Sequence, residues 1–303
     1  MEVVVVYKKS QLRLALEKRN SRIKALLKRG DASVLLMQSA NDAHEAALAE
    51  VERALKASRT LFRRVYRARL KGEMTVGKLV VSVGGDGTLL DASHKIAASP
   101  VFGVNSDTAH SVGFLCAANQ QTFAAQLDDI LASRWQPTAV RRMQGTIDEE
   151  PLPFPVLNDV LIAHKNAAAT SRYLIEHAGL MEDHKSSGVW MSTAVGSTAA
   201  MASAGGEIFA IDDERWQLRV REPFVADGPH LKLASLLLSP SEQVVVTSKM
   251  REGRVFLDGP HEGLALPMGA RLVMHDRAPP LYLFTTPEMA KRREAARRHA
   301  AAP

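Results

Sequence analysis

The sequence has a single cysteine and lacks any long apolar segment. Cys116 is its only cysteine among 303 residues, which excludes an internal disulfide and a zinc cluster built from several thiolates. No apolar run approaches the roughly 18–20 residues that a membrane-spanning helix needs. The N-terminal stretch MEVVVVYKK is too short and wrongly flanked for a signal peptide, and a strand is the better interpretation. We therefore expect a cytoplasmic protein that has no membrane partner.

Aromatic residues are also scarce, at 5% of the chain, although the net charge is +6. Basic side chains crowd residues 59–71 and 291–298, a pattern that attracts nucleic acid or other polyanions. Single-strand binders add aromatic platforms on which bases stack, and the chain has few. We therefore interpret both segments as solvated basic faces and expect no nucleic-acid partner. Apolar content of 46% is ordinary for a globular protein, and the length suggests about two domains.

The densest signal is Lys78–Leu90, KLVVSVGGDGTLL. Lys78–Val83 is a short β-branched run typical of a central strand in a parallel sheet. Gly84, Gly85 and Gly87 then permit backbone angles that a Cβ forbids and let a ligand approach closely. The stretch therefore predicts a strand, a tight glycine turn and a helix.

Two further residues give this turn a chemical character. Thr88 is expected to cap the following helix, whose free N–H groups favour a phosphate. Asp86 would repel that phosphate unless it holds a metal or accepts a proton, which suggests phosphoryl transfer. A dinucleotide fingerprint would need glycine at Leu90, and a P-loop would need a lysine in the helix. An ordinary strand-to-helix turn is the alternative.

The first half of the chain alternates between strand and helix patterns. We expect strands at 2–7, 33–38, 78–83 and 100–105, and helices at 12–27 with Gly30 as the stop, at 42–65, at 88–98 and at 120–133. The long helix begins with Asp42 and Glu45 as a capping box and turns Leu48, Val51, Leu55, Phe62 and Val65 inward. Such alternation predicts a doubly wound parallel sheet with its ligand at the carboxyl ends of the strands. Asp86 and Asn105 both follow strands, so both are expected to open onto one crevice.

The pattern changes near residues 135–137. Short β-like runs then follow at 140–147, 156–163, 172–177, 189–193, 216–221, 231–238, 243–248, 254–257, 271–275 and 281–285. A short helix is expected at 197–204, and a basic C-terminal helix or frayed tail at 287–301. We therefore expect an α/β domain over 1–136, a β-rich, largely antiparallel and sandwich-like domain over 137–286, and a basic helix or tail over 287–303.

Two segments of the second half carry polar groups in unusual places. Asn158 and Asp159 lie inside an apolar run, where each unpaired group would cost about 1–3 kcal/mol. They are suited to a ribose diol and a purine edge, and a structural bulge is the alternative. Residues 185–200, KSSGVWMSTAVGSTAA, surround a strand with small and hydroxyl side chains, and Ser197 or Thr198 is expected to cap a helix there. An ordinary tight contact between helix and sheet is the alternative for this segment.

The order GGDGT, LND, SSG, STAVGSTAA and SAGG resembles the NAD kinase family and covers about Lys78–Asp258. Diacylglycerol and sphingosine kinases share only the first element, and 6-phosphofructokinases share it more loosely. The segments NSD, HKSSG, AVGSTAAM and VREP look most like the plant NADH kinase and mitochondrial NAD kinase branch. The resemblance leaves open which redox form of the substrate is preferred.

The resemblance implies roles for particular residues. Asp86 would be the general base on the ribose 2′-hydroxyl, and the turn around it would shape the phosphate site. Ser187 stands where many bacterial members have an aspartate, and Ala200 where they have a tyrosine that stacks on the ligand. The residues expected to bind substrate or nucleotide are Gly84, Gly85, Gly87, Thr88, Asn105, Asn158, Asp159, Lys185, Ser187, Thr198, Ala199, Ser203 and Asp258.

The expected function is an ATP-dependent kinase that converts NAD⁺ or NADH into NADP(H). Mg²⁺ or Mn²⁺ is expected to accompany ATP, with no metal site formed by the protein alone. The resemblance also implies a homo-oligomer, a dimer or a tetramer. A lipid kinase is one alternative, but the small polar residues of Ser192–Ser203 do not suit the apolar entrance it would need. A nucleotide-binding sensor without turnover is another, and an intact Asp86 argues against it.

Overall fold

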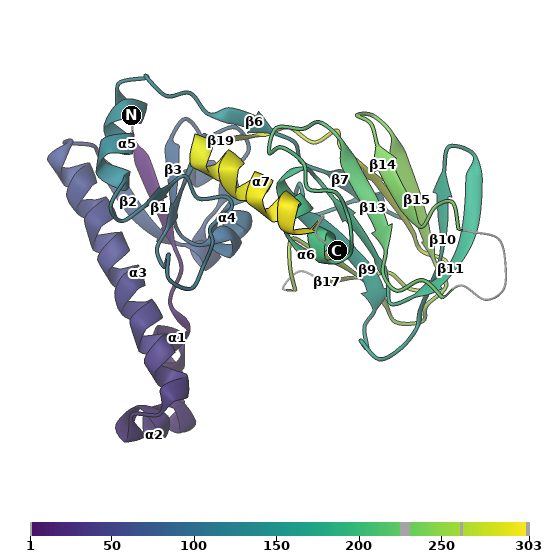
Figure 1. Ribbon diagram of the computed structural model, residues 1–303, viewed down its shortest axis with the longest axis horizontal. Coiled ribbons are helices and arrows are strands. Elements are labelled where there is room, and N and C mark those ends of the chain that lie inside the picture. The colour runs from purple at the N-terminus through teal and green to yellow at the C-terminus, as the bar shows by residue number, and fades with distance from the viewer. Residues whose placement is uncertain (1, 225–230, 261–262, 301–303) are drawn as a thin grey trace. The chain divides into compact units, whose positions relative to one another are not determined.

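A computed structural model describes residues 2–224, 231–260 and 263–300 (Figure 1). The chain divides into two compact units. The first unit comprises residues 1–138 and 282–289, and the second comprises residues 139–281 and 290–303.

The first unit is built on a mostly parallel sheet. Its strand order is β2-β1-β3-β4-β19-β6, with β5 beside β4. The strands are β1 (Val3–Tyr7), β2 (Phe62–Tyr66), β3 (Leu79–Gly84), β4 (Val101–Asn105), β5 (Ala118–Asn119), β6 (Thr138–Val140) and β19 (Leu281–Leu283). Strands β1 to β5 and the pair β4–β19 run parallel. The predicted parallel α/β class is confirmed.

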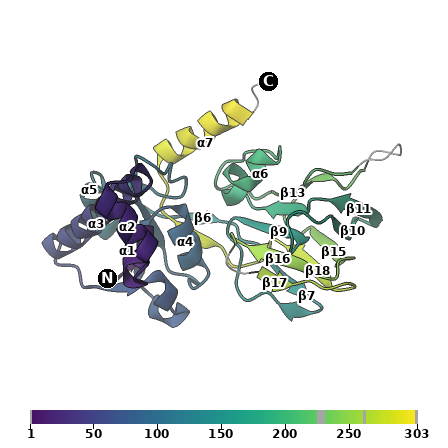
Figure 2. The ribbon, with the colours of Figure 1, turned by 90° about the horizontal axis from the view of Figure 1, so that it is seen from below.

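Helices cover both faces of this sheet (Figure 2). Alternate residues of β1 and β3 form one buried cluster with α3 (Ala32–Ala57) and α5 (Phe123–Leu131). The opposite face is covered by α4 (Asp86–Ser93), which contacts β1, β3 and β4. The two short helices α1 (Gln11–Glu17) and α2 (Ser21–Arg29) pack against α3. The 3₁₀ turns η1 (Arg67–Arg69) and η2 (Gly72–Met74) follow β2.

The predicted strand at 33–38 is wrong, because α3 already begins at Ala32. The side chain of Asp31 accepts a hydrogen bond from the Ser33 N–H at 2.9 Å and caps the helix. Leucine, methionine and glutamine in this run are all good helix formers. Asp42 therefore lies inside α3, and the predicted capping box there is also wrong.

The predicted helix over 42–65 is too long at its C-terminal end. Helix α3 ends at Ala57, and Phe62 and Val65 belong to β2. The predicted helix at 12–27 is interrupted, because the Asn20 side chain accepts from the Ile23 N–H and starts α2. Gly30 ends α2 in the left-handed conformation, as predicted.

The described residues of the second unit form two antiparallel sheets of six strands each. One has the order β11-β10-β15-β18-β7-β8, and the other has β14-β13-β12-β9-β16-β17. Alternate residues of both sheets form one buried core around Trp216 and Tyr173. The strands are β7 (Gln144–Ile147), β8 (Glu150–Pro151), β9 (Asp159–His164), β10 (Ser171–His177), β11 (Leu180–Ser186), β12 (Val189–Ser192), β13 (Trp216–Val220), β14 (Ser235–Leu238), β15 (Gln243–Ser248), β16 (Gly253–Leu257), β17 (Gly263–Ala265) and β18 (Arg271–His275). The predicted antiparallel, sandwich-like architecture is confirmed.

Three strands of this unit, β8, β11 and β17, were not predicted, and the run 140–147 is two strands rather than one. The short helix predicted at 197–204 is the 3₁₀ turn η3 (Val195–Thr198) followed by α6 (Ala200–Ser203). The C-terminal helix α7 covers Pro287–Ala300, and residue 301, the last that was predicted to be helical, lies outside the described residues. Among the described helices, none is both long and apolar enough to cross a membrane.

Candidate functional site

The turn that follows β3 depends on close packing rather than on unusual backbone angles. A Cβ placed on Gly84 would lie 2.2 Å from the Thr88 Oγ1 atom, so only glycine fits there. None of Gly84, Gly85 and Gly87 has a positive φ, so the turn does not use the left-handed backbone angles that glycine permits. A Cβ placed on Gly87 would have no atom from elsewhere in the fold within 4 Å. The turn is therefore tightly packed at Gly84 and open at Gly87.

Helix α4 begins two residues earlier than predicted. Gly85 is its N-cap and Asp86 its first residue, so the predicted cap at Thr88 is wrong. The Thr88 N–H donates to the Gly85 carbonyl at 2.9 Å, and its side chain is buried under the turn. Asp86 therefore lies on the first helical turn, where backbone N–H groups and the helix dipole favour negative charge.

The Asp86 carboxylate is held by two backbone amides from a distant loop. Its Oδ2 accepts from the Phe114 N–H at 2.9 Å and its Oδ1 from the Leu115 N–H at 2.8 Å. The side chain is half-buried. These two bonds, from consecutive residues of one loop, fix the orientation of the Asp86 carboxylate.

Asn105 organises the loop that supplies these amides. It pairs with Gly84 in register, which brings the ends of β3 and β4 together as predicted. Its Nδ2 donates to the Ser111 carbonyl at 2.8 Å, and its Oδ1 accepts from the Asp107 N–H at 3.1 Å. The side chain is buried. Asn105 therefore shapes the chain on its way from β4 to Phe114.

Two cations at the ends of β1 and β2 join this edge of the sheet. Lys8 directly follows β1, Arg67 directly follows β2, and Tyr7 pairs with both Tyr66 and Val83. Burial lowers the pKa of the Lys8 amine below its ordinary value, and the nearby charge of Asp107 opposes that shift. Neither cation was among the predicted site residues. The signal for Arg67 was hidden because β2 had been interpreted as helix.

A buried histidine ties the Lys8 backbone to β4. His44 Nε2 lies 2.9 Å from the Lys8 carbonyl oxygen, and Nδ1 lies 3.0 Å from the Ser106 Oγ. Burial lowers the pKa of His44, which favours the neutral ring. Because a carbonyl only accepts, Nε2 carries the proton and Nδ1 accepts from the Ser106 hydroxyl. The positions of Lys8 and of the Ser106 backbone are thereby linked.

In the second unit, Asp258 forms a clamp on the predicted dinucleotide-binding residues. Its Oδ2 accepts from the Leu157 N–H at 2.9 Å, and its Oδ1 accepts from the Asn158 and Asp159 N–H groups at 2.6 and 3.1 Å. Asp258 itself has a positive φ of 49°. The side chain of Asp258 thus fixes the backbone from which Asn158 and Asp159 project.

Asp159 is a buried carboxyl group, only 6% exposed. Burial, followed by the negative charge of Asp258, raises the pKa of Asp159 to about 7. The group is therefore partly protonated at neutral pH, and its protonated form can donate a hydrogen bond as well as accept one.

The segment 193–196 packs directly on this backbone. Thr193 donates its N–H to the Asn158 carbonyl at 3.1 Å and its hydroxyl to the Leu157 carbonyl at 2.5 Å. A Cβ on Gly196 would lie 2.1 Å from the Asn158 oxygen, so this contact requires glycine. Neither Ser197 nor Thr198 caps α6, whose N-cap is Ala199. The predicted cap is therefore wrong, while LND and STAVGST lie against each other.

Two other predicted residues of this unit, Ser203 and Ser187, line cavities. One cavity, of about 440 Å³, is lined by Ser203 and Ala200, and another, of about 420 Å³, is lined by Ser187. Trp190, Arg221 and Glu222 line both cavities. The Ser187 hydroxyl donates to the Glu222 carboxylate. Thr198 and Ala199 immediately precede α6.

Trp190 was not among the site residues predicted from the sequence. Its ring lies 5.9 Å from the Arg221 guanidinium carbon, and both side chains are half-buried. These flat groups line the cavity next to Ala200, where the resemblance expected a stacking tyrosine. Lys185 is exposed, with its amine 4.6 Å from the Phe224 ring centre.

Comparison with known proteins identifies the family. The model of the ATP-NAD kinase N-terminal domain matches residues 3–135. A rice (Oryza sativa subsp. japonica) protein described as a probable NADH kinase is 34% identical over 235 residues, which cover 70% of this chain and 72% of the rice protein. The chain belongs to the NAD kinase family.

Other relatives agree with this assignment to the NAD kinase family. The NADH kinase of Arabidopsis thaliana is 31% identical over 237 residues, covering 68% of this chain and 72% of the plant protein. An NAD kinase from Archaeoglobus fulgidus, solved in complex with ATP, shares the fold over 100% of both chains with a TM-score of 0.72 and 20% identity. Yeast NADH kinase complexed with NADH covers 97% of this chain and 86% of its own, with a TM-score of 0.68 and 17% identity. The predicted family and enzyme class, an NAD(H) kinase, are confirmed.

The described part of this NAD kinase family member contains no group of three or more His, Cys, Asp or Glu side chains placed to hold a metal ion. Mg²⁺ in phosphoryl-transfer enzymes is commonly held by one or two carboxylates together with substrate phosphates. Asp107 follows β4 at the same sheet edge as Asp86, and its carboxylate lies 2.9 Å from the His110 Nδ1. The residues present therefore fit a metal that arrives with ATP.

Proposed function

We propose that this NAD(H) kinase transfers the γ-phosphate of ATP to the adenosine-ribose 2′-hydroxyl of NADH or NAD⁺, with Asp86 as the general base. The observation that carries the proposal is the carboxylate of Asp86, oriented by the Phe114 and Leu115 amides at the carboxyl edge of a parallel sheet. Ligands bind at this edge in open α/β sheets.

The reaction requires no covalent bond between the protein and the transferred phosphate. A ribose hydroxyl is a poor nucleophile at neutral pH, and a positioned carboxylate that takes its proton typically contributes about 10²–10⁴-fold in rate. As the 2′-oxygen bonds to the γ-phosphorus, the bond to the ADP oxygen breaks and the proton passes to Asp86. ADP leaves and NADP(H) is formed.

We assign the phosphates of ATP to the edge of the first unit. Lys8 and Arg67 supply positive charge there, and the N-terminus of α4 supplies free N–H groups. Arg67 is already fixed by an ion pair with Asp91 at 2.7 Å. When bound, Mg²⁺ or Mn²⁺ would neutralise charge on the transferring phosphates, and Asp107 is the protein carboxylate that we assign to it.

We assign NAD(H) binding to the second unit. Asn158 and Asp159 would bind ribose and base groups, with Asp258 fixing their backbone. Thr198, Ala199 and Ser203 would line the pocket, and Lys185 and Ser187 would border it. A partly protonated Asp159 suits a neutral hydroxyl partner, because it donates to one oxygen while accepting from another.

The proposal also covers the preferred redox form of the substrate, the oligomeric state and the location of the enzyme. Because Ser187 and the NSD and VREP segments resemble the NADH-kinase branch, we propose that NADH is used at least as well as NAD⁺. We also propose a homo-oligomer, a dimer or tetramer, located in the cytoplasm and without a nucleic-acid partner. Light scattering on the purified protein measures its oligomeric state.

One assay tests the reaction directly. Purified protein with ATP and Mg²⁺ should convert NAD⁺ or NADH to its 2′-phosphate, detected with an NADP(H)-specific dehydrogenase. Parallel reactions contain diacylglycerol or sphingosine in place of the dinucleotide. Phosphorylation of a lipid without phosphorylation of either dinucleotide would make the lipid-kinase alternative correct, and binding of NAD(H) without turnover would make the protein a sensor.

A further inference from the structure

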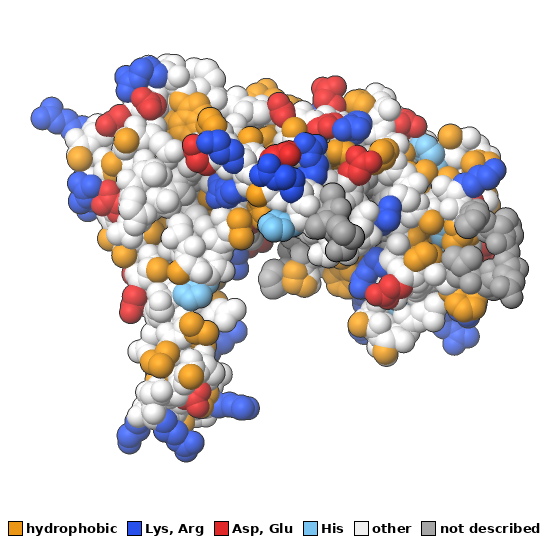
Figure 3. Space-filling model, viewed as in Figure 1, with side chains coloured by type: hydrophobic (Ala, Val, Ile, Leu, Met, Phe, Trp, Pro, Cys, Tyr) orange, Lys and Arg blue, Asp and Glu red, His pale blue; other side chains and the backbone are white. Residues whose placement is uncertain are grey.

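The C-terminal helix α7 carries a buried cation among exposed ones. Its sequence PEMAKRREAARRHA is rich in lysine and arginine, and Figure 3 shows basic side chains gathered over the position of this helix. Arg293 differs, because it is only 3% exposed. Removing a guanidinium from water costs several kcal/mol unless good hydrogen bonds replace the lost solvation.

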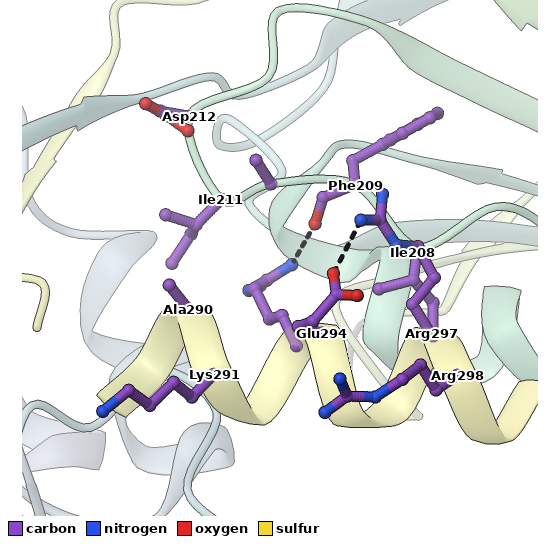
Figure 4. A pocket seen from close by; sticks show the side chains of 11 residues that line it. Ile208, Phe209, Ile211, Asp212, Ala290, Lys291, Glu294, Arg297 and Arg298 are labelled. Atoms are coloured by element: carbon purple, nitrogen blue, oxygen red, sulfur yellow. Dashed lines mark hydrogen bonds and ion pairs between the residues drawn. The ribbon is translucent and has the colours of Figure 1, made fainter. Parts of the chain in front are cut away.

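Arg293 donates hydrogen bonds to backbone carbonyls of the segment that follows β12. Its Nη2 donates to the Val195 carbonyl at 2.7 Å, and its Nη1 donates to the Ala194 carbonyl at 2.9 Å. Nη1 also lies 3.4 Å from the Ser197 Oγ and 3.3 Å from the Phe209 carbonyl oxygen. Figure 4 shows α7 beside residues 208–212, where the two border a cavity of about 510 Å³.

The same segment also contacts the backbone of Leu157 and Asn158. Gly196 lies against the Asn158 carbonyl so closely that no Cβ fits, and Thr193 bonds to the carbonyls of Leu157 and Asn158. Ser197 connects this segment to Phe209, because its hydroxyl donates to the Ala194 carbonyl at 2.7 Å and accepts from the Phe209 N–H at 3.0 Å. Residues 193–197 are thus fixed between Asn158 and Arg293.

We propose that Arg293 is a positioning residue for the NAD(H) pocket. By holding the Ala194 and Val195 carbonyls, it fixes the turn η3, which ends at Thr198, and therefore also the position of Ala199, which comes next in the chain. The planar guanidinium presents five donors in a rigid fork. It therefore reaches the Ala194 and Val195 carbonyls and the Phe209 carbonyl at once. This role rests on the proposed function only in assigning NAD(H) to that pocket.

The experiment compares Arg293→Met and Arg293→Lys with Arg298→Met, a matched change at an exposed arginine of the same helix. NADH and ATP affinities are measured by calorimetry, kcat and KM by the coupled assay, and folding by thermal denaturation. Because hydrogen bonds from charged groups are strong, Arg293→Met should raise the Kd and KM for NADH by about tenfold or more, with kcat and the Kd for ATP changed less than about threefold. Arg293→Lys should recover part of the NADH affinity, and Arg298→Met should match the wild type.

Chemical rescue of an Arg293→Ala variant distinguishes the positioning role from a general loss of stability. In Arg293→Ala, millimolar ethylguanidinium should restore NADH affinity, because it occupies the place of the missing group. Equal losses of NADH and ATP affinity, or unchanged NADH affinity in a folded Arg293→Met, would overturn the positioning role. A wild-type protein that binds ATP but no dinucleotide would instead overturn the proposed function.

Discussion

Replacing Asp159 with asparagine should make the protein more stable at alkaline pH while it weakens dinucleotide binding. Asparagine keeps the size of the side chain but does not titrate. The wild-type carboxyl has its pKa raised from 3.8 to about 7, mainly by burial. The folded state therefore holds this proton at pH values where the unfolded chain has lost it. The stabilisation that the proton provides is complete below about pH 4 and is lost as the pH rises through 7.

The size of the effect follows from linkage. Each pH unit in which the folded state holds one more proton than the unfolded state lowers the free energy of unfolding by about 1.4 kcal/mol. Between pH 5 and 8, Asp159 should therefore cost the wild type about 2–3 kcal/mol. Asp159→Asn lacks this titrating group. Its free energy of unfolding should therefore fall by about 2–3 kcal/mol less than that of the wild type between pH 5 and 8.

Urea denaturation of both proteins at pH 5 and at pH 8 measures this difference. The other titrating groups are common to both proteins, so they cancel in the comparison, and pH 5 serves as the internal control because the wild-type group is then protonated. Calorimetry should show NADH affinity reduced by about 1–3 kcal/mol in the variant. Identical changes in unfolding free energy between the two pH values would refute a buried, protonated Asp159, and unchanged NADH affinity would return the residue to a structural role.

Three further predictions concern the reaction itself. Asp86→Asn should lower kcat by at least about a hundredfold while the protein stays folded and still binds NADH; near-normal turnover would remove Asp86 as the base. Lys8→Met should raise the Kd for ATP by about tenfold and leave the NADH affinity within about twofold, as measured by calorimetry with each ligand. Equal losses of ATP and NADH affinity would contradict the assignment of Lys8 to the ATP site. The kcat/KM for NADH should equal or exceed that for NAD⁺, and a strong preference for NAD⁺ in steady-state kinetics would defeat the likeness to the NADH-kinase branch.

The sequence was most informative where local pattern and tertiary role agree. The buried strand that ends at Gly84 and the strand that ends at Asn105 were both predicted, because β-branched runs closed by glycine or a polar residue are typical of parallel strands. It was least informative at Phe62–Tyr66, FRRVY, whose arginines continue a basic run that looks helical. That error also concealed Arg67 at the end of the strand.

The predicted site was incomplete for a different reason. Phe114 and Leu115 act through backbone N–H groups, which every residue except proline carries, so no side-chain pattern marks them. Strand β11, LMEDHKS, was missed because charged and polar residues predominate in a mostly exposed edge strand. Arg293 lies in a basic helix whose other cations are largely exposed, and only the fold separates it from them.

The place of β19 in the first sheet has a consequence for synthesis on the ribosome. Leu283 pairs with Val101, and the Phe284 N–H donates to the Val101 carbonyl at 2.9 Å, although the whole run from Ala139 to Leu281 separates these partners in the chain. Strand β5 covers this edge of β4 at Val104 and Asn105, but the end at Val101 emerges long before β19 and stays exposed until then. An exposed strand edge invites pairing with other chains. Domains generally fold in order of emergence, but the first unit completes its sheet only after residues 139–281 have been translated. A nascent chain stalled before residue 281 should remain protease-sensitive in its N-terminal half, and one stalled far enough beyond residue 289 to clear the exit tunnel should become resistant.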